Sequence, residues 1–166
     1  SISQIIPEAP KVVSGNLTAG QILAVKNVDI SAYKNPTVAE AVKKANDDNT
    51  ITTVKEILTD LGVDTKTEEI KTTSGTVVNP SLYEMVTPFI DLVIEENGKT
   101  IYETTGEITA TITVEAVKDM NKKDILLMQI DPTTGKVYFI APEEFNSATG
   151  EITATFPTLG PVAVLK

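Results

Sequence analysis

From Glu107 to Val114 the chain reads Glu-Ile-Thr-Ala-Thr-Ile-Thr-Val, so apolar and polar side chains alternate along the stretch. Successive side chains of a β-strand point to opposite faces of the sheet. The alternation therefore predicts a strand with one buried and one solvent-facing side. Ile108, Ala110, Ile112 and Val114 make up the predicted buried side, and threonines make up the other.

Part of this stretch belongs to a sequence that occurs twice. Residues 105–111 and 149–155 both read Thr-Gly-Glu-Ile-Thr-Ala-Thr. Two copies without a third do not indicate a solenoid or a propeller, which repeat a unit several times at a fixed period. We interpret each copy as a turn that leads into a strand, and we expect the two strands to pack in the same way.

Two turn sequences elsewhere in this half predict β-hairpins. Asn97-Gly98 is the strongest short hairpin signal, because both residues accept a positive φ. In Asp131–Gly135 the proline presets a turn and the glycine accepts a bulge position. The runs that they separate are 89–95 and 99–103, and 124–130 and 136–141.

The chain ends in two more predicted strands, Glu151–Phe156 and Val162–Leu165, with a break at Gly160-Pro161 between them. Many short alternating runs within one half of a chain are typical of an antiparallel β-sandwich. We therefore expect a sandwich that is Ig-like in its general architecture.

The first half shows a different pattern. Residues 11–13 and 21–30 predict two short strands. Two helices follow, each starting with a Thr-x-x-Glu capping box: Thr37 with Glu40, and Thr53 with Glu56. Polar residues 46–49 end the first helix, and Gly62 suits a left-handed cap at the end of the second.

Together these patterns predict an α+β fold, with N-terminal strands and two amphipathic helices followed by the antiparallel β-sandwich. The stretch 64–74 is rich in Thr, Lys and Glu and is a plausible connector. We place a domain boundary there, which divides the chain into an α+β region (1–74) and a β-sandwich domain (75–166).

Composition excludes several kinds of chemistry. The 166 residues have a formal net charge of −9 and contain no Cys, no His, no Trp and no Arg. Nucleic acid binding needs clustered positive charge. Thiolate and imidazole metal ligands, and the general base most common near neutral pH, are absent. We expect no cofactor, no metal site and no nucleic acid partner.

The sequence says less about where in or outside the cell the protein acts. A chain without Cys suits either a reducing cytosol or a bacterial surface. No apolar run reaches the ~20 residues that span a bilayer, so we expect no membrane insertion. The polar start at residues 1–11 fits a protein trimmed after a signal peptide, and an ordinary chain boundary would look the same.

Adjacent carboxylates are the remaining candidates for catalysis, at 47–48, 68–69, 95–96 and 143–144. Glycoside hydrolysis needs two carboxyl groups that face each other across a cleft, so adjacent pairs in polar runs indicate solvated charge instead. Residues 47–49 (Asp-Asp-Asn) also offer oxygen ligands for calcium. The polar end of a helix explains the same residues.

Exposed tyrosines combine a large apolar area with a polar tip and often anchor a partner. The chain has four, which we take as candidate ligand contacts: Tyr33, Tyr83, Tyr102 and Tyr138. Tyrosines in strands are more often part of the core or its rim.

The C-terminal half, about residues 89–166, resembles a pattern at the C-terminal ends of secreted and cell-surface proteins of low-GC Gram-positive bacteria. The stretches that carry the resemblance are 124–131 (DILLMQID), 135–138 (GKVY), 150–156 (GEITATF) and 159–165 (LGPVAVL). The resemblance implies a surface β-sandwich module, extracellular or attached to the cell.

From exclusion and resemblance we expect a non-enzymatic binding or structural module, secreted or at the cell surface, that serves adhesion, ligand presentation or spacing. Its expected partner is a protein or a carbohydrate. Two alternatives stay open: a carboxylate-dependent hydrolase that acts on carbohydrate, and a calcium-stabilised structural domain.

Overall fold

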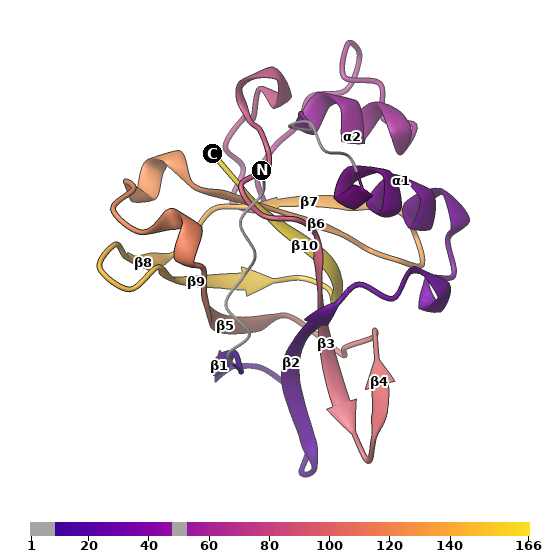
Figure 1. Cartoon of the computed structure of the whole chain (residues 1–166), viewed down its shortest axis with the longest axis vertical. Helices are drawn as coiled ribbons and strands as arrows, with labels where there is room; N and C mark the ends of the chain where they lie inside the picture. The colour runs from indigo at the N-terminus through magenta and orange to yellow at the C-terminus, as the bar shows by residue number, and fades with distance from the viewer. Residues whose placement is uncertain (1–8, 48–52) are drawn as a thin grey trace.

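The computed structural model describes residues 9–47 and 53–166. Two antiparallel sheets pack against each other, and two helices cover the outer face of the larger sheet (Figure 1). The layers are thus a small sheet, a large sheet and a helical layer. The predicted α+β class with an antiparallel β-sandwich is confirmed.

The small sheet has four strands in the order β1-β5-β9-β8. Their bounds are Lys11–Ser14 (β1), Ile108–Thr113 (β5), Glu151–Phe156 (β9) and Glu144–Asn146 (β8). β5 and β9 contain the two copies of the repeated sequence and form the centre of the sheet. Their alternation is the predicted one, with buried side chains facing the large sheet and threonines facing outward.

The two copies pair with each other antiparallel, and Ala110 lies opposite Ala154 at the centre. On the outer face Thr109 and Thr155 share a hydrogen bond between their hydroxyls at 2.7 Å, and so do Thr111 and Thr153. Each cross-strand pair adds to the stability of the sheet. The repeat therefore places equivalent side chains on two neighbouring strands, which confirms that the copies have the same packing role.

The large sheet has six strands, five of them in the order β2-β3-β10-β6-β7. The sixth strand, β4, pairs with the same edge of β3 as β10 does, but further along the strand. Their bounds are Gln21–Asn27 (β2), Ile90–Glu96 (β3), Lys99–Ile101 (β4), Leu126–Ile130 (β6), Val137–Ile140 (β7) and Gly160–Leu165 (β10). β2 and the β3–β4 hairpin extend beyond the body of the molecule (Figure 1). The predicted hairpin turn at Asn97-Gly98 is confirmed, with φ of 51° and 75°.

The helices are α1 (Pro36–Asp47) and α2 (Val54–Asp60). Thr53 caps α2 as predicted, by accepting a hydrogen bond from the Glu56 amide at 3.3 Å. The capping box at Thr37 is wrong, because Asn35 accepts hydrogen bonds from the amides of Thr37 and Val38 and caps α1 instead. An Asn two residues before the first free amides reaches them better than a threonine already inside the helix.

Gly62 ends α2 in the left-handed conformation, with φ of 81°. The Gly62 amide donates to the Thr59 carbonyl at 3.0 Å, and the Val63 amide donates to the Leu58 carbonyl at 2.9 Å. This pair of bonds is the Schellman motif, which satisfies carbonyls at a helix end. The predicted glycine cap is confirmed.

Four short 3₁₀ turns connect these elements: η1 (Ile30–Ala32), η2 (Pro80–Leu82), η3 (Glu115–Val117) and η4 (Lys122–Asp124). None of the helices in the described part of the chain is long and apolar enough to cross a membrane.

Apolar side chains form two cores, one on each face of the large sheet. The core between the sheets contains Phe156, Leu127 and Val164, and the core under the helices contains Phe89, Leu58 and Met128, among others. Leu127 and Met128 are neighbours in β6 and point into different cores. Both faces of the large sheet are therefore covered, which explains why all five residues of β6 and all six of β10 are buried.

Strands from the two predicted domains share both sheets. β1 pairs with β5, and β2 pairs with β3 along its full length. The core under the helices also contains residues of α1, α2, β6 and β10. The division into 1–74 and 75–166 stays a prediction about folding units, but neither sheet stops at that boundary.

The predicted break at Gly160-Pro161 is wrong, because both residues belong to β10, opposite Leu92 and Asp91 of β3. The short edge strand β8 (Glu144–Asn146) was not predicted, and Glu144 is exposed in it. Three residues are too few to show a period of two in the sequence.

Gln129 is an amide inside the core between the sheets. It lies in β6 between Val162 and Tyr138, and its side chain is inaccessible. Its amide nitrogen and oxygen have no hydrogen-bond partner. A buried amide without a partner costs about 1–3 kcal/mol.

We expect Gln129→Met, which keeps the length of the side chain and removes both polar atoms, to raise the free energy of unfolding by about 1–2 kcal/mol. Urea denaturation of both proteins measures the change. A loss of stability in Gln129→Met would mean that the amide is hydrogen-bonded in solution and would contradict the prediction.

Candidate functional site

A groove about 410 Å³ in volume opens where the polar segment 70–78 meets η4 and the loop after β7. We call it the lysine groove. Its lining combines aliphatic side chains, one aromatic ring and two ammonium groups, contributed chiefly by Val77, Tyr83, Lys122, Lys123, Ile125 and Pro142. Pockets of about 300–1,000 Å³ with an apolar lining and a few polar groups are typical of ligand sites.

One wall of the lysine groove is a small β-turn structure. The Thr72 amide donates to the Thr76 carbonyl, and the Val78 amide donates to the Ile70 carbonyl, each at 2.8 Å. The Thr73 amide donates to the Phe139 carbonyl of β7 at 2.8 Å, which ties the turn to the edge of the large sheet. Val77 lies on this wall and is 61% exposed.

The opposite wall carries the two lysines, on η4. The Lys122 ammonium donates to the Glu143 carbonyl at 2.6 Å, so its position is fixed. The Lys123 side chain is exposed. Within residues 9–47 and 53–166, neither lysine has a carboxylate within ion-pair distance, although six other lysines do.

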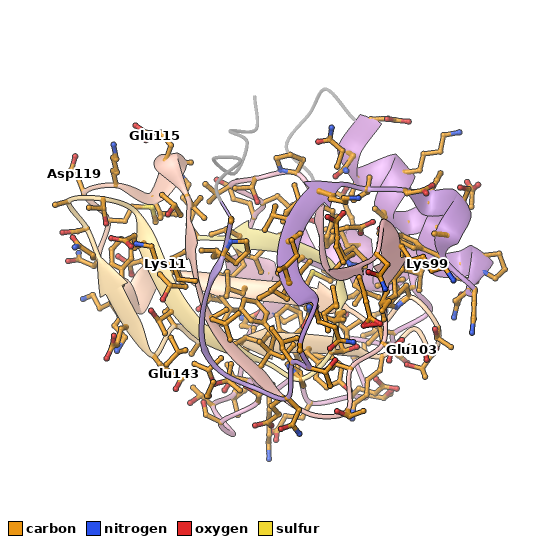
Figure 2. The ribbon with its side chains drawn as sticks, turned by 90° about the horizontal axis from the view of Figure 1, so that it is seen from below. Lys11, Lys99, Glu103, Glu115, Asp119 and Glu143 are labelled. Atoms are coloured by element: carbon orange, nitrogen blue, oxygen red, sulfur yellow. The ribbon has the colours of Figure 1, made fainter. Side chains whose placement is uncertain are left out.

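A second groove, about 430 Å³ in volume, lies on the other side of Ala141 and Pro142, which line both. We call it the glutamate groove, because Glu107 and Glu143 line it together with the hydroxyls of Thr73, Ser74 and Thr155. The Thr155 hydroxyl donates to the Glu143 carboxylate at 2.5 Å. Figure 2 shows Glu143 on the side of the molecule away from Lys99 and Glu103.

A buried polar cluster lies in β3, at the base of the arm formed by β2, β3 and β4. Asp91 is 1% exposed and accepts three hydrogen bonds. The donors are the Tyr33 hydroxyl at 2.5 Å, the Tyr102 hydroxyl at 2.7 Å and the Asp29 amide at 3.1 Å. The two tyrosine rings meet edge to face, with centroids 5.9 Å apart.

Burial perturbs the pKa values of this cluster. Loss of solvent raises the pKa of Asp91, and the hydrogen bonds from Tyr33 and Tyr102 offset part of that rise. Burial, together with the nearby carboxylate, raises the pKa of both tyrosines above its ordinary value. Both hydroxyls therefore stay protonated and act as donors.

The four candidate tyrosines fall into three environments. Tyr33 and Tyr102 are the donors to Asp91, and Tyr33 is only 7% exposed, so its ring is part of the core under the helices. Tyr83 lines the lysine groove. Tyr138 is half-buried in β7, with the Lys136 ammonium 5.0 Å from its ring centroid. Contact of any of them with a ligand stays a prediction.

The acidic pairs are separated in space. Glu95 forms an ion pair with Lys26 on β2, and Glu69 forms one with Lys71 at 3.2 Å. Asp47 is the exposed last residue of α1, and the predicted calcium ligands Asp48 and Asn49 lie outside the described residues. The described part of the chain contains no group of three or more acidic side chains arranged to hold a metal ion.

Sequence reasoning missed the two grooves, because the walls of each come from several segments that are separated in the chain. Lys122-Lys123 is a noticeable pair in an acidic sequence, but only the fold brings it to Tyr83 and Val77. Comparison with protein-family models, curated proteins and solved structures finds no match.

Proposed function

We propose that this chain is a non-enzymatic binding module that acts outside the cell or on its surface, with the lysine groove as its contact site. The resemblance of residues 89–166 to surface modules of Gram-positive bacteria supports the location. The module binds a partner and does not transform it.

The lysine groove is the observation that carries the proposal. Specific binding sites combine an apolar anchor point with a few placed polar groups, and aromatic residues often supply much of the binding energy. The groove has aliphatic walls, the half-buried ring of Tyr83 and two ammonium groups that have no carboxylate partner within the described residues. Its walls are held by backbone hydrogen bonds, so the site is formed before the ligand arrives.

A thermal-shift screen against a glycan panel, cell-wall fragments, surface-protein peptides and calcium tests this function. A ligand at about one hundred times its dissociation constant stabilises the native state by about 2.7 kcal/mol, which raises the Tm of a domain of this size by about 5–10 °C. We expect such a shift with one class of compound. A chain that shifts with none of them would be a spacer.

Two exposed valines allow the site to be located. Val77 is 61% exposed on the lysine groove, and Val13 is 63% exposed on β1 of the small sheet. We expect Val77→Asp to lose the ligand-induced shift and Val13→Asp to keep it, with little change in the Tm of either free protein. The opposite pattern would place the site on the small sheet.

A hydrolase is the second candidate, favoured by the glutamate groove. Glu107 and Glu143 are 36 positions apart in the sequence, yet they line one concave surface. Two carboxyl groups across a cleft are what glycoside hydrolysis requires. Release of a chromophore from nitrophenyl glycosides, lost in both Glu107→Gln and Glu143→Gln, would replace the binding proposal with this one.

The third candidate, a calcium-stabilised domain, is tested by the calcium arm of the same screen. A Tm that rises with calcium and falls with a chelator would support it. Asp47→Asn should then remove the response, because its carboxylate is one of the predicted ligands.

A further inference from the structure

We propose that the lysine groove recognises a short segment of a partner protein in which a single carboxylate lies next to an aliphatic side chain. This inference rests on the proposed binding function and names the class of ligand. The aliphatic side chain occupies the groove beside Val77 and Tyr83, and the carboxylate pairs with Lys123.

Charge is the first step in the argument. The chain has 23 acidic and 14 basic residues, so its overall field repels anions. Six lysines are already paired with carboxylates of the same chain, whereas Lys122 and Lys123 have no such partner within residues 9–47 and 53–166. The lysine groove thus offers an acidic ligand two ammonium groups without a carboxylate partner, of which Lys122 already donates one hydrogen bond to the Glu143 carbonyl.

The negative net charge of the chain also limits how many negative charges a ligand can carry. Charges separated by more than about 8–10 Å are screened at physiological ionic strength, so a carboxylate inside the groove interacts mainly with the two lysines. A long polyanion would extend beyond the groove and be repelled by the net charge of −9 that the chain carries. The groove therefore favours a ligand with one or two carboxylates over an anionic polymer.

The lining favours a protein segment over a sugar. Apart from Tyr83, the apolar part of the lining is aliphatic, with Val77, Ile125 and Pro142 as its main members. Sugars are usually bound beside several aromatic rings, whereas an aliphatic wall suits a branched side chain such as that of leucine. A volume of about 410 Å³ has room for one such side chain and the adjoining backbone.

Lys123 and Lys122 have different roles. Lys122 is held by the Glu143 carbonyl and helps to fix the loop that separates the two grooves. The Lys123 side chain is exposed and forms no ion pair within residues 9–47 and 53–166, so its ammonium can bind the carboxylate of a ligand. A substitution at Lys123 therefore tests recognition without disturbing the loop.

Titration of ¹⁵N-labelled protein with two matched compounds tests the proposal. N-acetyl-leucine carries a carboxylate next to an isobutyl group, and N-acetyl-leucinamide has the same shape without the charge. We expect the acid to bind about fivefold more tightly than the amide, the advantage of a favourable exposed ion pair. The amides of Val77, Tyr83 and Lys123 should shift most.

Two substitutions of equal charge change provide the control. Lys123→Glu should abolish the preference for the acid, whereas Lys99→Glu should keep it. Lys99 lies on β4, on the side of the molecule away from Glu143, whose carbonyl accepts a hydrogen bond from Lys122 (Figure 2). N-acetyl-Leu-Glu-amide, with its carboxylate on a side chain, distinguishes an internal acidic residue from a free C-terminus as the natural contact.

Three results would overturn the proposal: equal affinity of acid and amide, shifts centred outside the groove, or no binding of either compound up to its solubility limit. The first would leave the proposed binding function intact with a neutral ligand. A positive thermal-shift result with a glycan, alongside failure here, would separate the binding function from this choice of ligand.

Discussion

Gly150→Ala is expected to lower the free energy of unfolding by about 3–5 kcal/mol. Gly150 ends the turn between β8 and β9 with φ of 79°, a left-handed conformation that is unfavourable for alanine. A Cβ atom at this position would lie 2.2 Å from the Val114 carbonyl oxygen. That oxygen belongs to the backbone, so relief of the clash requires the two segments to move apart.

The movement would break specific hydrogen bonds. The Val114 amide donates to the Gly150 carbonyl at 2.9 Å, and the Gly150 amide donates to the Asn146 carbonyl at 2.8 Å. These bonds hold the start of β9 against the end of β5. Their loss would separate the two central strands of the small sheet at one end.

The repeated sequence supplies the matched control, because Gly106 has the same position in the first copy. It lacks a positive φ, and the nearest atom to an added Cβ is the Asn16 side-chain nitrogen at 3.7 Å. Gly106→Ala should change the free energy of unfolding by less than about 1 kcal/mol. Urea denaturation of both variants measures the difference, and a cost below about 1 kcal/mol for Gly150→Ala would show that the turn relaxes.

This pair of glycines shows what sequence alone predicts and what it does not. The alternation in the two copies predicts their strands and their buried faces, because a period of two depends only on neighbouring residues. The different requirements at Gly106 and Gly150 come from what packs against each turn. Identical local sequences therefore have unequal tolerance to substitution, and only the fold reveals the difference.

The same distinction holds for the other elements. The Asn97-Gly98 hairpin, the Thr53 cap and the Gly62 cap were predictable because their geometry is set within a few residues. The pairing of β1 with β5 and of β2 with β3 was not, because the paired strands are roughly 60 to 100 residues apart in the chain. A hydrophobic run predicts that a strand exists but not which sheet it joins.

The candidate site was less predictable than the fold. Two of the four tyrosines singled out by composition turned out to be donors to a buried carboxylate, and the sequence had given Asp91 no special role. Asp91 lies in an apolar run, Phe-Ile-Asp-Leu-Val-Ile, where a buried acid is uncommon. An acid inside such a run is the one sequence feature that would have indicated a buried polar cluster.

Asp91→Ala is expected to lower the free energy of unfolding by about 3–4 kcal/mol at neutral pH. It would leave three donors without their acceptor: the hydroxyls of Tyr33 and Tyr102 and the amide of Asp29. The Tyr33 hydroxyl is buried and the other two donors are partly buried, and an unsatisfied buried group costs about 1–3 kcal/mol. The removed carboxyl group would also leave a small cavity beside β3.

Asp91→Asn separates the hydrogen bonds from the charge. The amide has nearly the same shape; its oxygen can accept from Tyr102 and Asp29, and its nitrogen can donate to the Tyr33 oxygen. We expect its stability at neutral pH to be within about 1 kcal/mol of the natural chain, because most contacts persist and the buried charge is gone. Thermal and urea denaturation of the two variants distinguish the role of the contacts from that of the charge.

The difference in stability between the natural chain and Asp91→Asn should change with pH in one direction. Burial raises the folded-state pKa of Asp91 above the unfolded value of about 3.9. A group of this kind contributes stability that is fully present below the unfolded pKa and is lost as the pH rises through the folded pKa. The natural chain should therefore lose stability relative to Asp91→Asn as the pH rises above about 4.

The charged and titratable groups around Asp91 do not reverse this sign. The negative charge of the Asp29 carboxylate adds to the rise in the pKa of Asp91. The tyrosines Tyr33 and Tyr102 remain protonated throughout this range because their own pKa values are raised. The difference in unfolding free energy between the natural chain and Asp91→Asn, measured from about pH 4 to pH 8, isolates Asp91 from every other acid. A difference in unfolding free energy that is constant across this range would show that Asp91 has the same pKa in the folded and unfolded states. A difference of opposite slope would show that the three hydrogen bonds lower the pKa of Asp91 by more than burial raises it.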